Sequence, residues 1–277
     1  MSTLGQHKRR LDALHDIRDI MAALKNISLT EGLRLRRFLD TQQRVVTGIE
    51  QAMADFLSHY PQDLPGCDAQ FEIILLVGSE RGFCGDFNET LLGHLTTVSP
   101  AQQALIVVGG KLAGRLEETR IPAATMAGPT TVEDVPSVLL AVVDKLRELN
   151  ARHDTAQLTI VHHQYDGHSV ALRHRQPFRD FATQATPRGY PPLLNVPPQI
   201  FFRELIDHFL FAVLHGIFYS SLAAEHQIRL QHLQGAIEHI DRQSTSLTQR
   251  YNSLRQELIT EEIELIVLSA GSLLQEE

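Results

Sequence analysis

Proline is missing from both ends of this 277-residue chain: all twelve prolines lie between Pro61 and Pro198. Proline interrupts the interior of a helix because it has no amide hydrogen to donate and its ring clashes with the preceding turn. A long proline-free segment is therefore free to form one helix. The distribution predicts long helices over residues 1–60 and 199–277, on either side of a compact middle segment, 61–198.

Tryptophan and clustered cysteines are also missing. With only Cys67 and Cys84, the chain has neither a disulfide framework nor the ligands of a typical zinc site, and this usage fits a reducing compartment. The formal net charge of −8 argues against nucleic-acid binding, which usually needs a basic face. We therefore expect a folded protein with no nucleic-acid partner.

Long uncharged apolar runs are missing as well. The most apolar stretch, 201–219, contains Arg203, Glu204 and Asp207, so it is too polar to span a bilayer. Charged residues begin at Lys8 and no apolar core follows them, so we expect no signal peptide. Any membrane association is expected to be indirect, through partner proteins.

The C-terminal segment carries a regular apolar stripe. Its positions recur in steps of three and four from Leu230 to Leu268, and ten of the twelve are apolar or tyrosine. Such a heptad stripe predicts a coiled coil. The positions are Leu230, Leu233, Ile237, Ile240, Ser244, Leu247, Tyr251, Leu254, Leu258, Glu261, Leu265 and Leu268.

The N-terminal segment carries a matching stripe, in two seams that are offset near Ser28 and Gly32. Because the chain returns through the middle segment, the simplest arrangement is an antiparallel coiled coil between the two ends of one chain. The alternative is that both stripes belong to the core of an ordinary helical bundle. The rest of the chain is too short to bury both segments along their full length. The seams are Leu11, Leu14, Ile17, Met21 and Leu24, then Leu35, Leu39, Gln42, Val46, Ile49, Met53 and Phe56.

The middle segment alternates continuous apolar runs with amphipathic ones. This alternation is typical of a mostly parallel sheet, and it predicts an inserted Rossmann-like α/β domain. We expect a stiff, proline-rich connector over 187–198. The predicted strands are 71–77, 104–108, 158–163 and 169–175, and the predicted helices are 86–95, 111–118 and 132–150.

Motifs for catalysis or for a cofactor are missing. The glycine-rich turn 78–85 matches neither the dinucleotide-binding spacing nor a P-loop, and 109–111 lacks the rest of a P-loop. Cys84 is better interpreted as a buried structural thiol than as a nucleophile. Four histidines in or between strands lack the spacing of a metal site. They are His162, His163, His168 and His174. We predict no catalytic residue, cofactor or metal site.

Three stretches together resemble the gamma subunits of F-type rotary ATP synthases. They are Asp16–Ser28 (DIRDIMAALKNIS), Gly78–Asn88 (GSERGFCGDFN), and Ser221–His226 (SLAAEH) followed by Tyr251–Ala270 (YNSLRQELITEEIELIVLSA). They occur in the family's order and span nearly the whole chain. Departures such as Glu80, where the family has Asp, indicate a divergent member, for which an alternative, sodium-linked N-type ATPase is one interpretation.

The resemblance implies a central-stalk rotor subunit that is not itself an enzyme. The coiled coil would turn inside a ring of alpha and beta subunits, and the α/β domain would contact the epsilon subunit and the membrane c-subunit ring. Rotation would couple ion translocation to ATP synthesis or hydrolysis at the cytoplasmic face of a bacterial inner membrane. The open alternatives are a coiled-coil scaffold and a small α/β enzyme with helical arms for oligomerisation.

The resemblance also implies roles for particular residues. Three match positions that hydrogen-bond a loop of one catalytic subunit at a time: Arg255, Gln256 and Thr260. Five match the family's turn at the foot of the shaft, where we expect a mainly structural role: Arg81, Gly82, Cys84, Gly85 and Asn88. Four lie on the shaft: Leu24, Lys25, Leu254 and Leu258. The apolar segment 265–272 suits a bearing at the tip.

Overall fold

The computed structural model describes residues 3–62, 64, 71–95, 102–153, 156–167, 169–184 and 191–273. The chain divides into two compact units, one formed by residues 1–27 with 231–277 and the other by residues 28–230. This division differs from the predicted segments because both long helices contribute to each unit. Cys67, His168 and part of the predicted connector 187–198 lie outside the described residues.

Two long helices confirm the prediction drawn from proline. Helix α1 is Thr3–His59 and helix α6 is Pro198–Leu273. Pro198 opens α6, where its missing amide hydrogen costs no helical hydrogen bond. One window of α6 reaches a mean hydropathy of 1.4, enough by length and composition for a membrane span, but 61% of that window is buried inside the protein. Such burial is typical of the core helix of a folded protein.

The unit of residues 28–230 is built on a five-stranded sheet in the order β3-β2-β1-β4-β5. The first four strands are parallel and β5 is antiparallel to β4, which confirms the predicted, mostly parallel sheet. The three-residue strand β3 was not predicted, because so short a strand has no readable pattern. The strands are β1 (Phe71–Val77), β2 (Gln103–Val108), β3 (Ala124–Met126), β4 (Ala156–Tyr165) and β5 (Val170–Arg175).

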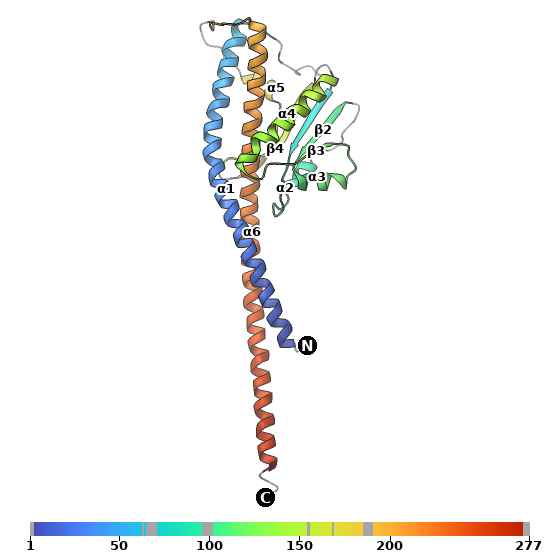
Figure 1. Cartoon of the computed structure of the whole chain (residues 1–277), viewed down its shortest axis with the longest axis vertical. Coiled ribbons are helices and arrows are strands. Elements are labelled where there is room, and N and C mark those ends of the chain that lie inside the picture. Colours follow the sequence, from blue (N-terminus) through green and yellow to red (C-terminus); the bar gives the residue numbers. More distant parts are fainter. Residues whose placement is uncertain are drawn as a thin grey trace. The chain divides into compact units, whose positions relative to one another are not determined.

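Each face of the sheet has its own core, because successive residues of β1 point to opposite faces. Leu76 packs with residues of α2 and α3, whereas Leu75 packs with residues of α4, α5 and the parts of α1 and α6 in this unit. Figure 1 labels these helices. Helix α5 was not predicted, and a 3₁₀ turn opens the predicted helix 132–150. The elements are α2 (Phe87–Leu92), α3 (Gly110–Glu117), η1 (Val132–Asp134), α4 (Val135–Arg152) and α5 (Pro177–Gln184).

Candidate functional site

In the unit of residues 1–27 and 231–277, the two long helices pair antiparallel. Leu233, Ile237 and Ile240 of α6 are buried in the seam between them. Three polar pairs also cross the seam. From one pair to the next, the residue number rises along α1 by as much as it falls along α6, as in an antiparallel pair. They are His15 with Ser244 (3.3 Å), Arg18 with Asp241 (2.7 Å) and Lys25 with Gln234 (3.0 Å). The predicted antiparallel coiled coil is confirmed.

The seam of α1 departs from the predicted one at Ile17. Ile17, a predicted seam residue, is 45% exposed, whereas Arg18 is partly buried and bonded to Asp241. Steps of three and four from Leu14 to Met21 pass equally well through position 17 or 18, so the pattern alone could not choose. Arg18 suits the seam because its apolar stem packs while its charged end reaches a carboxylate.

Beyond Gln256, helix α6 continues without a partner helix among the described residues. The antiparallel register, extended to Thr3 at the start of α1, reaches only Gln256. Leu258 is accordingly 42% exposed and Leu265 67% exposed. Leu254 is therefore the last position of the predicted stripe that has α1 opposite it, so the coiled coil within this chain is shorter than the stripe.

Of the three predicted contact residues, Arg255 and Gln256 lie where the paired part of α6 ends, and Thr260 lies beyond it. Arg255, Gln256 and Thr260 are all exposed. The hydroxyl of Thr260 donates to the backbone carbonyl of Gln256 at 2.9 Å, and the Arg255 side chain forms no ion pair with the residues that the structure describes. Arg255 and Gln256 are thus available to another molecule, and their contact with a catalytic subunit stays a prediction.

The predicted turn 78–88 belongs to the other unit and is closed by paired polar groups. The Ser79 amide donates to Asn88 Oδ1 at 3.0 Å, and Asn88 Nδ2 donates to Ser79 Oγ at 2.8 Å. Phe83 and Gly85 have φ angles of +64° and +55°, in the left-handed region that disfavours a side chain. Gly85 adopts this angle without strain, whereas Phe83 is held in a strained conformation.

Two amides that could hold an anion are already bonded within the chain. The amides of Gly110, at the start of α3, and of Gly128 donate to Glu80 Oε2 at 2.7 and 2.6 Å. Free amides at a helix N-terminus commonly bind phosphate. Here the Glu80 carboxylate occupies that position, and its charge repels a second anion.

Gly109→Ala is expected to lower the free energy of unfolding by about 2 kcal/mol or more. Gly109 has φ of +116°, and an added Cβ would lie 2.7 Å from the carbonyl oxygen of Ser79. Gly114→Ala in α3 is the control, since its Cβ would meet nothing within 4 Å. That variant should gain about 0.5–1 kcal/mol. Urea unfolding of both variants measures the difference, and equal effects would contradict the geometry.

Cys84 is a buried thiol rather than a reactive one. Its side chain is 5% exposed and donates to the backbone carbonyl oxygens of Arg81 and Gly82, both at 3.4 Å. Burial, reinforced by the nearby Glu225 carboxylate, raises the pKa of Cys84 to about 11, although Arg229 opposes the shift. The thiol is therefore protonated at neutral pH, as expected for a structural role.

In a Cys67→Ser variant, Cys84 should react with a disulfide reagent at pH 8 about 100-fold more slowly in the folded chain than in urea. The reason is that its pKa rises from 9.0 to about 11 on folding, so the thiolate fraction falls. Absorbance of the released reagent thiol gives both rates. Similar rates in the folded and unfolded chain would show that the thiol is accessible.

The histidines of β4 are core residues. His162 and His163 are buried, and burial lowers the pKa of each to about 4, so both are neutral at pH 7. His163 Nε2 lies 3.0 Å from the Thr90 hydroxyl, and its ring stacks on Phe87 with centroids 4.0 Å apart. No group of three His, Cys, Asp or Glu residues in the described part of the chain could hold a metal ion.

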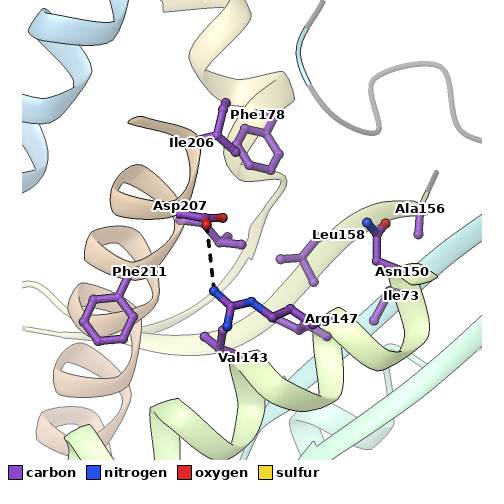
Figure 2. Close-up of a pocket in the computed structure, with 12 residues that line it drawn as sticks. Ile73, Val143, Arg147, Asn150, Ala156, Leu158, Phe178, Ile206, Asp207 and Phe211 are labelled. Carbon is purple, nitrogen blue, oxygen red and sulfur yellow. Dashed lines mark ion pairs between the residues drawn. The ribbon is translucent and has the colours of Figure 1, made fainter. Parts of the chain in front are cut away.

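An apolar cavity of about 230 Å³ lies among α4, β4, α5 and α6 (Figure 2). Leu158, Phe178 and Ile206 are among its apolar walls, and Arg147 faces Asp207 with an N–O distance of 3.8 Å. Both charged side chains are mostly exposed, so the pair contributes only about 0–1 kcal/mol. The lining pairs no nucleophile with a base, which gives the enzyme interpretation no support here.

Two residues in contact with the turn were missed from the sequence. Glu225 and Arg229 of α6 form a buried ion pair beneath it. The signal was present, because a Glu and an Arg four residues apart lie at positions that the apolar pattern of α6 would bury. The structure brings them together with Gly82 and Cys84, far away in the sequence.

Comparisons with known proteins agree over nearly the whole chain. Residues 3–273 match the family described as ATP synthase. The ATP synthase gamma chain of Clostridium beijerinckii is 23% identical over 280 residues, covering 96% of both chains. That of Amoebophilus asiaticus is 24% identical and covers 99% of this chain and 100% of its own.

Solved structures show the same fold at low sequence identity. The rotor of the Euglena gracilis mitochondrial ATP synthase has a TM-score of 0.62 at 14% identity, covering 93% of this chain and 99% of the other. The central stalk of the Tetrahymena thermophila mitochondrial enzyme has a TM-score of 0.58 at 13% identity, covering 78% of this chain and 99% of the other. At such identity the likeness concerns the fold.

Proposed function

Because this chain belongs to the ATP synthase gamma chain family, we propose that it is the rotor of the central stalk of a rotary F-type ATPase. Its paired helices turn inside a ring of catalytic alpha and beta subunits. Its α/β part bears on an epsilon subunit and a membrane c-subunit ring at the cytoplasmic face of a bacterial inner membrane. The chain couples ion translocation to ATP synthesis or hydrolysis and performs no chemistry itself.

The unpaired end of α6 is the observation that carries the proposal. Ile263, Leu265 and Val267 are 54%, 67% and 64% exposed there. A single helix is marginal in water, and clustered exposed apolar side chains usually mark an interaction surface. This end therefore suits a partner that surrounds it, as a ring of catalytic subunits would.

The length of α6 supports a mechanical role. Its 76 residues, at 1.5 Å each, make a helix on the order of 110 Å long. Leu233 and Ile237 pack in the seam against α1, which stiffens this helix along the paired part. A stiff element transmits rotation without dissipating it in bending.

Four potentially reactive groups of the α/β part have structural roles, which supports a non-catalytic role for the chain. The Cys84 thiol is protonated, and His162 and His163 are neutral and buried. The Glu80 carboxylate accepts hydrogen bonds from the backbone amides of Gly110 and Gly128. None of these groups combines the accessibility and charge state that catalysis at neutral pH needs.

The proposal is tested by purifying the tagged chain from its native membranes, with an untagged strain as control. Mass spectrometry should find P-loop alpha and beta subunits, and the eluate should hydrolyse ATP. Recovery of the chain alone would contradict the rotor and favour a scaffold. Turnover of a small-molecule substrate by the isolated chain would instead favour the enzyme alternative.

A further inference from the structure

One face of α6 lies against the carboxyl end of β1. Ser221, Glu225 and Arg229 follow at four-residue spacing, so they share one side of the helix. The Ser221 hydroxyl donates to the carbonyl oxygen of Val77, the last residue of β1, at 3.4 Å. In doubly wound sheets this end of the strands, where the strand order reverses, forms the ligand crevice. Here α6 lies against that edge.

Arg229 makes three polar contacts with the turn. Its Nε donates to the carbonyl oxygen of Gly82 at 3.1 Å, and Nη2 donates to that of Arg81 at 3.4 Å and to Cys84 Sγ at 3.2 Å. Nη2 also pairs with the Glu225 carboxylate. Because a guanidinium is planar and rigid, it fixes these acceptors relative to one another.

Glu225 holds the turn from the same side. The backbone amides of Arg81 and Glu80 lie against its carboxylate. Burial raises the pKa of Glu225, and the ion pair with Arg229 is the strongest influence that opposes the rise. A buried carboxylate is unfavourable without such partners, so the ion pair and the turn depend on each other.

The turn needs support from outside. Residues 78–86 belong to no helix or strand, and Phe83 is held at a positive φ angle. A strained backbone persists only where its surroundings fix it. The carbonyl groups of Arg81 and Gly82, which Arg229 binds, come directly before Phe83.

We propose that Glu225 and Arg229 are positioning residues that lock the turn, and with it the sheet, to α6 against rotation about the helix axis. Apolar packing, as at Ala224, resists separation but has no preferred direction. Hydrogen bonds and a buried ion pair are directional and resist slipping. The proposal rests on the rotor function, because it states which residues transmit torque from the α/β part to α6.

The test uses the double variant Glu225→Leu/Arg229→Met in the full chain. It replaces the buried ion pair by apolar side chains, a change that folded proteins often tolerate, and it removes the directional contacts. The control is Glu238→Leu/Arg242→Met, the same residues at the same spacing on an exposed part of α6. If the double variant fails to fold, Arg229→Lys keeps the charge and loses the planar fork.

The first measurement is hydrogen exchange of the isolated chain. Amides of residues 79–88 should exchange about tenfold faster in the variant, with β1 and the control unchanged. Unchanged exchange at the turn would contradict the proposal that Glu225 and Arg229 hold it in place, whatever the function of the chain.

The second measurement is ions pumped per ATP hydrolysed in membrane vesicles carrying the assembled complex. This ratio should fall about threefold or more while hydrolysis continues. A normal ratio despite faster exchange at the turn would contradict the proposal that Glu225 and Arg229 transmit torque to α6. If the wild-type chain assembles with no ATPase, the rotor function is contradicted, and so is the role of this contact in transmitting torque. The hydrogen-exchange result would still show whether Glu225 and Arg229 hold the turn against α6.

Discussion

Phe56→Ala is expected to lower the free energy of unfolding by about 3–5 kcal/mol. Phe56 is 1% exposed, and its ring centroid lies 5.2 Å from those of Tyr60 and Phe201 and 5.9 Å from that of Phe202. Truncation removes these contacts and leaves a cavity between helices too rigid to collapse into it. Urea unfolding followed by circular dichroism gives the loss.

Phe38→Ala is the matched control on the same helix. Phe38 is 48% exposed, and its ring meets that of Tyr219 at 5.7 Å. We expect a loss below about 1.5 kcal/mol, since little area is buried and one aromatic contact is removed. Equal losses for Phe56→Ala and Phe38→Ala would show that burial does not govern stability in this part of the chain.

Arg255→Ala/Gln256→Ala is expected to lower ATP turnover of the assembled complex about tenfold. The variant would lose the predicted hydrogen bonds to a loop of a catalytic subunit. A hydrogen bond to a charged group contributes about 1.5–3 kcal/mol, and a loss of about 1.4 kcal/mol lowers a rate tenfold. Both side chains are exposed, so the unfolding of the isolated chain should not change. Steady-state ATP hydrolysis by purified wild-type and variant complexes measures the effect.

Glu261→Ala/Glu262→Ala is the control for that variant. These residues are also exposed and follow on the same helix, but they have no assigned contact. Their replacement should leave turnover near the wild-type value. Unchanged turnover for Arg255→Ala/Gln256→Ala in a fully assembled complex would remove the assigned contact with a catalytic subunit.

Features set by local chemistry could be predicted from the sequence. The absence of proline outside 61–198 gave both long helices, since one proline suffices to interrupt a helix. The apolar run of β1 gave a buried parallel strand, because such a strand is covered on both faces. Each conclusion needs only neighbouring residues and holds wherever the segment packs.

Features that depend on a partner far along the chain could not be predicted. Arg229 binds the carbonyl oxygen of Gly82 across 147 positions, which no spacing reveals. The choice between Ile17 and Arg18 as the seam residue depends on Asp241 of the facing helix. The end of the paired seam near Leu254 is likewise fixed by where α1 begins opposite it.

Rotation of the α/β part against the catalytic ring is the most direct test of the rotor function. A probe can be attached at Leu193→Cys, because Leu193 is fully exposed. Cys67→Ser removes one of the two native thiols, and the other, Cys84, is buried and should not be labelled. With the ring immobilised, ATP should drive rotation of the probe in one direction. A stationary probe on a complex that hydrolyses ATP would contradict the function proposed for this chain.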